Sequence, residues 1–279
     1  MGLVSYANYP RQCLGYEAIM FQVHQIPAFK DNYFWLIQPN AQSVDTYIVD
    51  PGASKPVNNY LQANNLRLKG ILLTHHHHDH IDGAVALSEK YHLPIHGPNS
   101  NRIPQVTHFL EEGDYLNLGV LTAKVLTLPG HTLDHIAYLI EPADSAPMLF
   151  SGDTIFAAGC GRLFDGTAEL LYASLQKITA LPDNTLIYAA HEYTLSNINF
   201  ALDVEPENKD LLARCITETR KREAGIATLP THLALEKQTN PFLRCHLKAV
   251  QTYIQQKVTT PLSSDVEFFA SLRLIKDSF

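Results

Sequence analysis

The spacing of hydrophobic positions changes along the chain. Up to about residue 192, short apolar runs broken by Asn, Pro and Gly alternate with amphipathic stretches, which predicts β-strands interleaved with α-helices. The run LKGILLT at residues 68–74 is almost entirely apolar, as expected of a strand that is buried on both faces. Further along, the pattern is typical of helices alone. We therefore predict an α/β domain followed by a smaller helical domain.

The individual runs give the predicted elements. Strands are predicted at residues 21–29, 32–39, 45–52, 68–74, 93–98, 114–130, 135–142, 147–154 and 184–191. Helices are predicted at residues 54–65, 81–91, 168–181, 194–204, 207–225, 247–257 and 266–275. The change near Tyr193 divides the chain into an α/β domain at residues 20–192 and a helical domain at residues 193–279.

The N-terminal residues 1–19 precede the first strand-like run, and a second methionine, Met20, stands directly before that run. We interpret residues 1–19 as an N-terminal extension outside the fold. The alternative is an additional N-terminal strand.

The composition fits a globular protein with a core, since 46% of the 279 residues are hydrophobic. The net charge is −7 and the basic residues are dispersed, which disfavours a nucleic-acid-binding protein. No apolar run approaches the ~18 residues of a membrane span, and we see no secretory signal. We expect no nucleic-acid or membrane partner. The sequence carries no usable signal for the oligomeric state, and a monomer is our working expectation.

The cysteines are few and widely separated, which matches neither a disulfide framework nor a CxxC zinc site. They are Cys13, Cys160, Cys215 and Cys245. We therefore expect a protein of the reducing cytoplasm.

The sequence THHHHDHIDG at residues 74–83 follows the apolar run 68–74 directly. In an extended segment, residues two apart point the same way, so His75 and His77 would face one point while His76 and His78 face away. Asp79 and the histidine after it follow as the chain turns into a helix. Imidazole and carboxylate together suit zinc, iron or manganese. A polar loop without metal is the competing interpretation.

Three later segments carry further metal-type residues at the ends of predicted strands. They are His131 in LPGHT, Asp153 in LFSGDT and His191 in IYAAHEYT. Sites in α/β sheets form at the carboxyl ends of strands. Four strand ends that agree in this way favour a metal site over a solvated loop.

With these residues in view, the chain resembles a known superfamily. THHHHDH is similar to the T-H-x-H-x-D-H motif of the metallo-β-lactamases, and GHT, SGDT and HEYT follow in the expected order over roughly residues 20–192. The longer segments FSGDTIFAAGCGRLFDGT, HEYTLSNINFALDVEPEN and NPFLR resemble the glyoxalase II family, the hydroxyacylglutathione hydrolases. That resemblance extends over about residues 20–279.

The resemblance implies a four-layer αββα sandwich followed by a smaller helical domain, and two divalent metal ions. Zinc is our first expectation, with iron or manganese as alternatives. By position, one set of ligands would be His75, His77 and His131, the other Asp79, His80 and His191, with Asp153 shared by both ions.

The implied reaction is hydrolysis of a glutathione thioester such as S-lactoylglutathione, the last step of methylglyoxal detoxification. A hydroxide held between the two ions would attack the thioester carbonyl, since metal coordination lowers the pKa of water from 15.7 toward ~7. Asp79 would help to orient this hydroxide. Ser151 and Cys160 lack the adjacent base of a covalent nucleophile, so we interpret both as packing residues.

The glutathione contacts implied by the resemblance fall on five positions: Arg162, Phe164, Tyr193, Arg244 and Lys248. Phe164 stands where some family members have Tyr, so an aromatic wall remains without its hydroxyl. Lys248 lies outside a tight motif. Replacement of Arg244 by alanine is expected mainly to raise KM.

Other residues near the motifs keep two interpretations. Asp50 either hydrogen-bonds a ligand histidine or forms a turn before Pro-Gly. Asp134 and His135 either support the ligands or are structural. Ala190 replaces a Gly common in the family, which is tolerated where φ is negative.

Competing functions within the superfamily are a tRNA-processing nuclease, a persulfide dioxygenase and a β-lactamase. The first would show a basic surface, the second generally lacks the helical tail, and the third would carry a secretory signal. A non-catalytic metal-binding or scaffolding protein is the rival from another class. Such proteins often lose ligands, whereas all seven expected positions are occupied here. The acyl group of the substrate is not fixed by the sequence.

Overall fold

The computed structural model describes residues 21–279, so both interpretations of residues 1–19 lie outside the described residues. The first β-sheet has its strands in chain order, five of which were predicted, while the short β6 was not. Its strands are β1 (Gln22–Ala28), β2 (Asn32–Gln38), β3 (Asp45–Val49), β4 (Arg67–Leu72), β5 (Ile95–Pro98) and β6 (His108–Leu110). Strands β1 to β3 are antiparallel, and β3 to β6 are parallel.

The second sheet has the order β14-β13-β10-β9-β8-β7. Its strands are β7 (Tyr115–Leu118), β8 (Leu121–Thr127), β9 (Ile136–Ile140), β10 (Met148–Gly152), β13 (Leu186–Ala189) and β14 (Thr231–His232). A separate hairpin is formed by β11 (Ile155–Phe156) and β12 (Gly159–Cys160).

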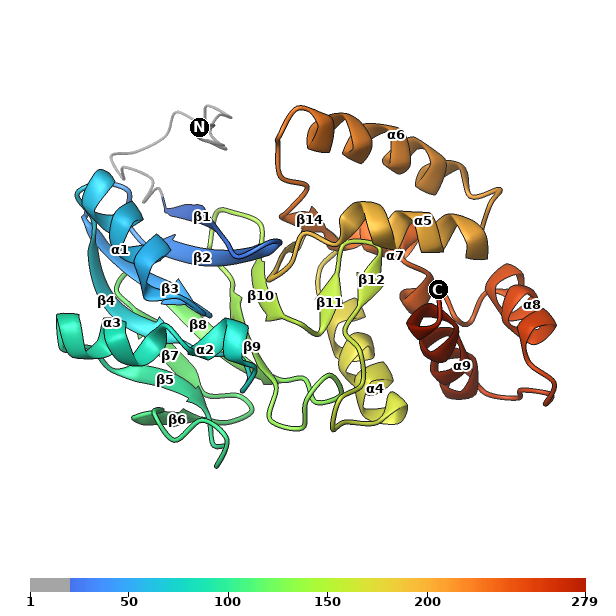
Figure 1. Cartoon of the computed structure of the whole chain (residues 1–279), viewed down its shortest axis with the longest axis horizontal. Coiled ribbons are helices and arrows are strands. Elements are labelled where there is room, and N and C mark those ends of the chain that lie inside the picture. The colour runs from blue at the N-terminus through green and yellow to red at the C-terminus, as the bar shows by residue number, and fades with distance from the viewer. Residues whose placement is uncertain (1–20) are drawn as a thin grey trace.

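The helices of the described residues are α1 (Ser54–Ala63), α2 (His78–Ile81), α3 (Ala84–Tyr91), α4 (Ala168–Thr179), α5 (Thr194–Val204), α6 (Lys209–Glu223), α7 (Leu233–Thr239), η1 (Pro241–Leu243), α8 (Lys248–Lys257) and α9 (Asp265–Asp277). Helices α1 and α3 lie on one side of the molecule beside the first sheet, and the C-terminal helices gather on the other side, beyond the second sheet (Figure 1).

Three buried clusters define the layers. Val57 of α1 and Leu87 of α3 pack with Ile71 of β4 on the outer face of the first sheet. Trp35 and Tyr138 belong to a cluster that fills the space between the two sheets. The third cluster packs α4 and the C-terminal helices against the outer face of the second sheet. This arrangement confirms the predicted αββα sandwich with a helical C-terminal region.

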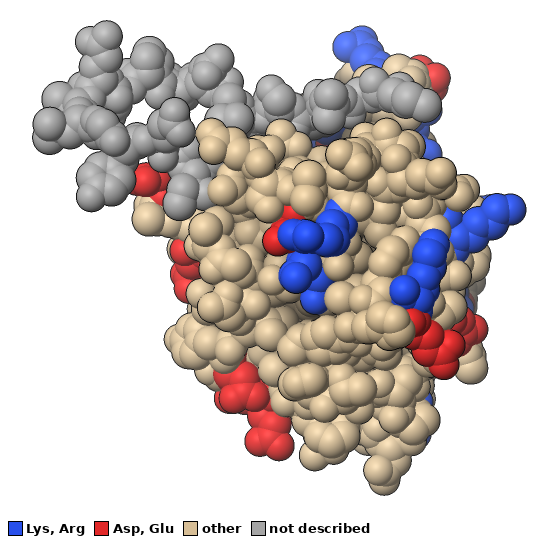
Figure 2. Space-filling model, turned by 90° about the vertical axis from the view of Figure 1, so that its left-hand side faces the viewer, with Lys and Arg blue, Asp and Glu red and all other residues tan. Residues whose placement is uncertain are grey.

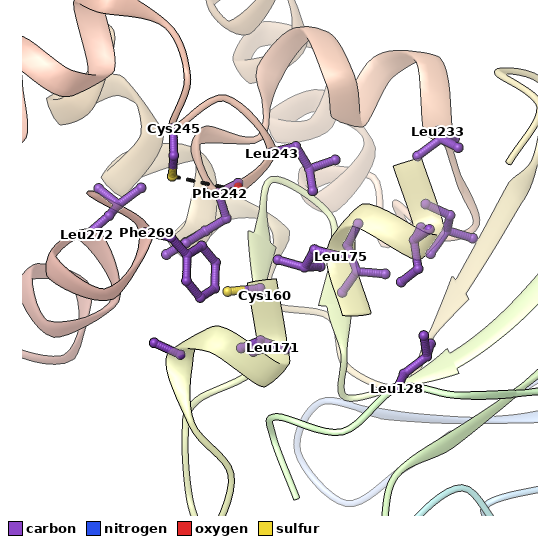
Figure 3. Packing of buried hydrophobic residues seen from close by; sticks show 14 of the residues in the cluster. Leu128, Cys160, Leu171, Leu175, Leu233, Phe242, Leu243, Cys245, Phe269 and Leu272 are labelled. Atoms are coloured by element: carbon purple, nitrogen blue, oxygen red, sulfur yellow. Dashed lines mark hydrogen bonds between the residues drawn. The ribbon is translucent and has the colours of Figure 1, made fainter. Parts of the chain in front are cut away.

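The C-terminal helices share this third core with α4 (Figure 3). Phe242 and Phe269 are almost fully buried and lie edge to face, with ring centroids 5.9 Å apart. Cys160 of the hairpin and Leu171 of α4 belong to the same cluster. Apolar packing therefore holds the C-terminal helices directly against α4 and the β11–β12 hairpin.

A buried polar network also connects the helical region to the β11–β12 hairpin. Glu236 of α7 is fully buried and its Oε2 accepts the backbone N–H of Ala158, at 2.8 Å. Its Oε1 pairs with Arg214 of α6, at 2.5 Å. The side chain of Asn240 donates to the carbonyl oxygen of Gly159, at 2.9 Å. Ala158 has a left-handed backbone, with φ of 55°, so these contacts hold a turn that a non-glycine residue adopts reluctantly.

Some elements differ from the sequence prediction. The single strand predicted at residues 114–130 is the hairpin β7–β8, because Gly119 takes a φ of 83° and reverses the chain. Strand β14 lies in the region predicted to be helical and pairs antiparallel with β13. The boundary near residue 192 therefore stays a proposal, because β14 returns to the sheet beyond it.

On the face drawn in Figure 2, basic and acidic side chains lie among many neutral ones and do not merge into one continuous basic surface. Within residues 21–279, no helix has the length and apolar character needed to cross a bilayer. The three cysteines in this range are unpaired thiols: Cys160, Cys215 and Cys245.

Candidate functional site

The predicted ligands meet where strands of both sheets end. The loop after β4 and the start of α2 contribute His75, His77, Asp79 and His80, and the second sheet contributes His131, Asp153 and His191 after β8, β10 and β13. Two groups form within this set, each with all of its donor atoms within 4.8 Å of one another. The first group is His75, His77, His131 and Asp153, and the second is Asp79, His80 and His191.

Short distances connect the members of the first group. The Nδ1 atom of His77 lies 3.0 Å from Nε2 of His75 and 3.1 Å from Nε2 of His131. Asp153 links both groups, because its Oδ2 lies 3.4 Å from Nε2 of His131 and its Oδ1 lies 3.4 Å from Nε2 of His191. In the second group, Nε2 of His191 is 3.3 Å from Oδ2 of Asp79.

The cluster fits a divalent cation. Nε2 of His80 and Oδ1 of Asp153 are buried and have no hydrogen-bond partner among the described residues. Buried polar atoms without partners are costly and rare, so an additional group is expected between them. Neutral nitrogen and anionic oxygen donors that converge on one point are what zinc, iron or manganese would take.

The far nitrogens of four cluster histidines are fixed by hydrogen bonds. Nδ1 of His131 donates to the carbonyl oxygen of Arg162, at 2.8 Å. The partners of the others are Thr74 Oγ1 at 2.9 Å for His75, Asp50 Oδ2 at 3.0 Å for His80, and Asp31 Oδ1 at 2.9 Å for His191. Such contacts orient an imidazole so that its other nitrogen faces the ion.

Asp50 therefore supports a cluster histidine rather than serving only as a turn residue. Its backbone has a φ of 50°, and its carboxylate also accepts the backbone N–H and the hydroxyl of Thr74. His135 supports the cluster too, because its Nε2 accepts the backbone N–H of Asp153, at 3.0 Å. Gly152 packs closely against these supporting residues and has a φ of 49°. A Cβ at this position would lie 2.7 Å from Nε2 of His135. A side chain at residue 152 would thus displace the strand end that carries Asp153.

Burial controls the charge of several cluster histidines. It lowers the pKa of His77 to about 4, with a further contribution from His131, and it lowers the pKa of His75 well below its ordinary value. Neutral imidazole is the form that binds metal ions. For Asp79, burial raises the pKa, but hydrogen bonding to His191 and the charge of His80 outweigh it, so the net shift is downward. Asp79 is therefore an anionic donor.

The two remaining histidines of the run lie outside both groups. His76 is hydrogen-bonded to Asp134, and its Nδ1 lies 2.9 Å from Oδ1 of that aspartate. His78 has a side chain that is 91% exposed and pairs with Asp82. The predicted division of the histidine run agrees with these positions, and Asp134 supports a histidine that is not in the cluster.

Aromatic rings line one side of the cluster. Phe164 is exposed, and its ring centroid lies 4.7 Å from that of His77 and 5.1 Å from that of His131. Tyr193 stacks on His191, with centroids 4.7 Å apart and an angle of 6° between the rings. Phe156 of the hairpin packs edge to face against both, 5.9 Å from His191 and 5.2 Å from Tyr193.

Arg162 lies beside the cluster, because its own carbonyl oxygen accepts the bond from His131. Its side chain is exposed and pairs with Asp277 of α9, at 3.4 Å. Lys276 of the same helix was not anticipated from the sequence. Burial and the charges of Arg273 and Arg162 lower the pKa of Lys276 to about 8. Arg162 and Lys276 are therefore close enough to influence each other's charge, and Arg162 is the one whose backbone contacts the metal-type residues.

The structure does not bring Arg244 or Lys248 into this cluster. The guanidinium of Arg244 is bound on two sides by Glu205, at 2.8 Å and 2.9 Å, and also donates to the carbonyl oxygen of Lys237. Lys248 begins α8 and lines a hollow with Gln251, Thr252 and Leu262. A substrate role for either residue stays a prediction, and their contacts here do not support it.

Asp31 and Asn32 are further residues that the sequence interpretation missed. Asp31 lies between two predicted strands and Asn32 begins the second of them, yet both contact cluster members. A polar pair at the start of a strand buried along its whole length was the available signal.

Neither proposed packing residue is set up as a nucleophile. Ser151 is fully buried and its hydroxyl donates to the carbonyl oxygen of Ile155, at 3.2 Å. Burial raises the pKa of the Cys160 thiol to about 11, so it stays protonated near neutral pH. Ala190 is absent from the described residues with positive φ, so it fits the place of the family's glycine.

Comparison with known proteins gives matches along the chain. Residues 31–191 match the family model described as the metallo-β-lactamase superfamily, and residues 192–279 match the one described as the hydroxyacylglutathione hydrolase C-terminus. A hydroxyacylglutathione hydrolase of Pseudomonas aeruginosa is 47% identical over 93% of this chain and 100% of its own length. One from Pseudomonas savastanoi pv. phaseolicola is 46% identical over the same shares. The crystal structure of ETHE1 from Myxococcus xanthus superposes with a TM-score of 0.61 at 24% identity, covering 93% of this chain and 99% of that one.

Proposed function

The chain belongs to the hydroxyacylglutathione hydrolases of the metallo-β-lactamase superfamily, and on this premise we propose that it converts S-(2-hydroxyacyl)glutathione to glutathione and a 2-hydroxy acid. It is a metal-dependent thioester hydrolase. The observation that carries the proposal is the meeting of seven histidine and aspartate side chains at one end of the sandwich. The similarity to enzymes of this name spans both the sandwich and the helices that follow it.

We propose two ions, most simply both zinc, with iron or manganese as alternatives. His75, His77 and His131 would hold one, Asp79, His80 and His191 would hold the other, and Asp153 would contact both. When bound, such ions supply Lewis acidity to a carbonyl oxygen and lower the pKa of water toward ~7. The residues themselves hold the donors still: Asp50, Asp31 and the Arg162 carbonyl fix the far nitrogens of three histidines.

Departure of the leaving group needs little help from the protein. A thioester releases a thiolate, which leaves readily, so no general acid is needed beside the cluster. Asp79 is anionic and is held by Asn32, whose Nδ2 donates to its Oδ2 at 2.9 Å. A carboxylate in that position can accept a hydrogen bond from an attacking water and so orient it.

Substrate binding is proposed at the aromatic and cationic side of the cluster. Phe164 and Tyr193 would form walls on either side of the thioester. Arg162 and Lys276 would bind the carboxylates of glutathione, since guanidinium and ammonium groups suit carboxylates. The pair between Arg162 and Asp277 is exposed, so a substrate carboxylate could compete for this guanidinium. We favour Lys276 over Arg244 because Arg244 already has a carboxylate partner in Glu205.

The proposal is tested with a panel of substrates on the intact chain. Purified protein is assayed with S-lactoylglutathione, a phosphodiester and a β-lactam, before and after metal removal by a chelator. We expect hydrolysis of the thioester alone, loss of activity on removal, and recovery with Zn²⁺, Fe²⁺ or Mn²⁺. Circular dichroism checks that the stripped protein stays folded. Thioesterase activity that survives complete stripping, or preference for another substrate, would overturn the proposal.

A further inference from the structure

Asp31 and Asn32 stand next to each other at the start of β2 and reach the second donor group together. Oδ1 of Asp31 lies 2.9 Å from Nδ1 of His191. Nδ2 of Asn32 donates to Oδ2 of Asp79, at 2.9 Å. Two consecutive residues outside the cluster therefore contact two of the three members of one group.

This pair also lies where the two sheets are tied together. Asn32 forms a β-bridge with His191, although β2 belongs to the first sheet and His191 follows a strand of the second. The backbone N–H of Glu192 donates to the carbonyl oxygen of Asp31, at 2.9 Å, and that of Tyr33 to the carbonyl oxygen of Ala190, at 2.7 Å. The position of His191 relative to Asp79 is thus set through the start of β2.

The first donor group is supported differently. The far nitrogen of His75 contacts the Thr74 hydroxyl, and that of His131 contacts the Arg162 carbonyl. Within residues 21–279, no hydrogen bond joins Asp31 or Asn32 to His75, His77 or His131. Changes at the start of β2 should therefore act on one ion and spare the other.

We propose that Asp31 and Asn32 are positioning residues for the ion held by Asp79, His80 and His191, an inference that rests on the proposed function. Asp31 accepts the Nδ1–H of His191, which leaves the Nε2 lone pair directed at the cluster. Asn32 holds one oxygen of Asp79 and so sets the direction of the carboxylate. Loss of such supporting contacts typically weakens metal binding by about 10–100-fold.

The test measures metal binding, not activity. Full-length wild type and the variants Asp31→Ala, Asp31→Asn and Asn32→Ala are stripped and dialysed against Zn²⁺ buffers of graded free concentration. Metal per chain is then determined, and a parallel Co²⁺ titration records the visible absorption bands. We expect one of the two ions to bind about 10–100-fold more weakly in each variant, with the other unchanged. If Asp31→Ala does not fold, Asp31→Asn provides the test, because it keeps the shape of the side chain.

Asp134→Asn is the matched control, because it removes the same kind of carboxylate from His76, which lies outside the cluster. It should leave both binding steps as in wild type. The proposal is overturned if the Asp31 and Asn32 variants bind both ions like wild type, or if both ions weaken equally. Failure of the proposed function would look different, since wild type itself would then bind no stoichiometric metal or hydrolyse no thioester.

Discussion

The imidazole of His76 is bonded to the carboxylate of Asp134, with Nδ1 2.9 Å and 3.0 Å from its two oxygens. Nε2 of the same ring lies 3.1 Å from Nη1 of Arg102. Both nitrogens of His76 are therefore engaged away from the metal-type cluster, whereas the neighbouring ring of His77 contacts two cluster histidines. His76 and His77 are adjacent in the sequence, but only His77 contacts the metal-type cluster.

Replacement of His77 by alanine is expected to lower kcat/KM by more than about 100-fold, since removal of a proposed metal ligand should exceed the effect of losing a supporting contact. His76→Ala should keep its metal content and most of its activity. His78→Ala is the control, because that side chain is exposed. Metal analysis and initial rates on folded proteins decide the matter. Equal inactivity of the His76 and His77 variants would contradict the division.

Arg244 and Lys276 are expected to separate in a comparison of kinetics and stability. Arg244→Ala leaves Glu205 buried without its partner, so the free energy of unfolding should fall by about 2 kcal/mol. Lys276→Ala should instead raise KM several-fold, because it removes a cation from the proposed carboxylate site. Urea unfolding and steady-state kinetics test both. A rise in KM for Arg244→Ala at unchanged stability would restore the interpretation made from the sequence.

The Arg214–Glu236 pair should be sensitive to loss of either partner. Both side chains are at most 2% exposed, so Glu236→Gln leaves a buried guanidinium uncompensated, and we expect a loss of about 3–5 kcal/mol of unfolding free energy. Lys177→Met, which breaks the exposed pair with Glu112, should cost less than about 1 kcal/mol. Chemical denaturation provides both values. A Glu236→Gln protein as stable as the Lys177 variant would show that the buried network contributes little.

His96 is expected to make stability depend on pH. Burial, with a smaller contribution from His108, lowers its pKa from 6.5 to about 4. The unfolded chain therefore takes up a proton between those values while the folded chain does not, so stability is present above pH 6.5 and falls as the pH drops toward 4. The loss by pH 5 should be about 1 kcal/mol after allowance for partial exposure.

The comparison for His96 is with His96→Gln, which cannot take up this proton. The difference in unfolding free energy between pH 7.5 and 5.0 should be about 1 kcal/mol smaller in the variant than in wild type. Equal differences in the two proteins would mean that His96 is not responsible.

Elements of the fold could be predicted from the sequence where hydrophobic and polar residues form a local pattern along the chain. Strand β4 and the amphipathic α4 lie where the sequence placed them. The predicted burial of both faces of β4 holds only from Gly70 onward, because Arg67 and Lys69 are exposed. Short elements escaped, because two residues of β14 or of β11 carry no periodicity and exist only through their tertiary partners. The turn at Gly119 shows how a single left-handed glycine divides an apparently continuous strand.

The candidate metal ligands could be predicted from the sequence, but the residues that support and surround them could not. Spacing on one loop brought His75 and His77 together, and strand ends supplied His131, Asp153 and His191. The support from Asp31 depends on contact between two sheets, and the position of Lys276 relative to Arg162 depends on how the last helix docks. Neither is encoded in a local motif. Arg244 shows the converse, since a motif suggested a free cation where the fold supplies Glu205 as its partner.

The order in which the donors occur along the chain bears on biosynthesis. His75 through His80 leave the ribosome early, Asp153 appears only halfway through synthesis, and His191 comes after β13. The ion proposed for the first donor group needs Asp153, and the ion proposed for the second needs His191. Neither ion can therefore acquire its full ligand set before β10 of the second sheet has been synthesised. Full binding of both ions would thus follow the pairing of strands from both sheets, and metal uptake would not be the nucleus around which the sandwich assembles.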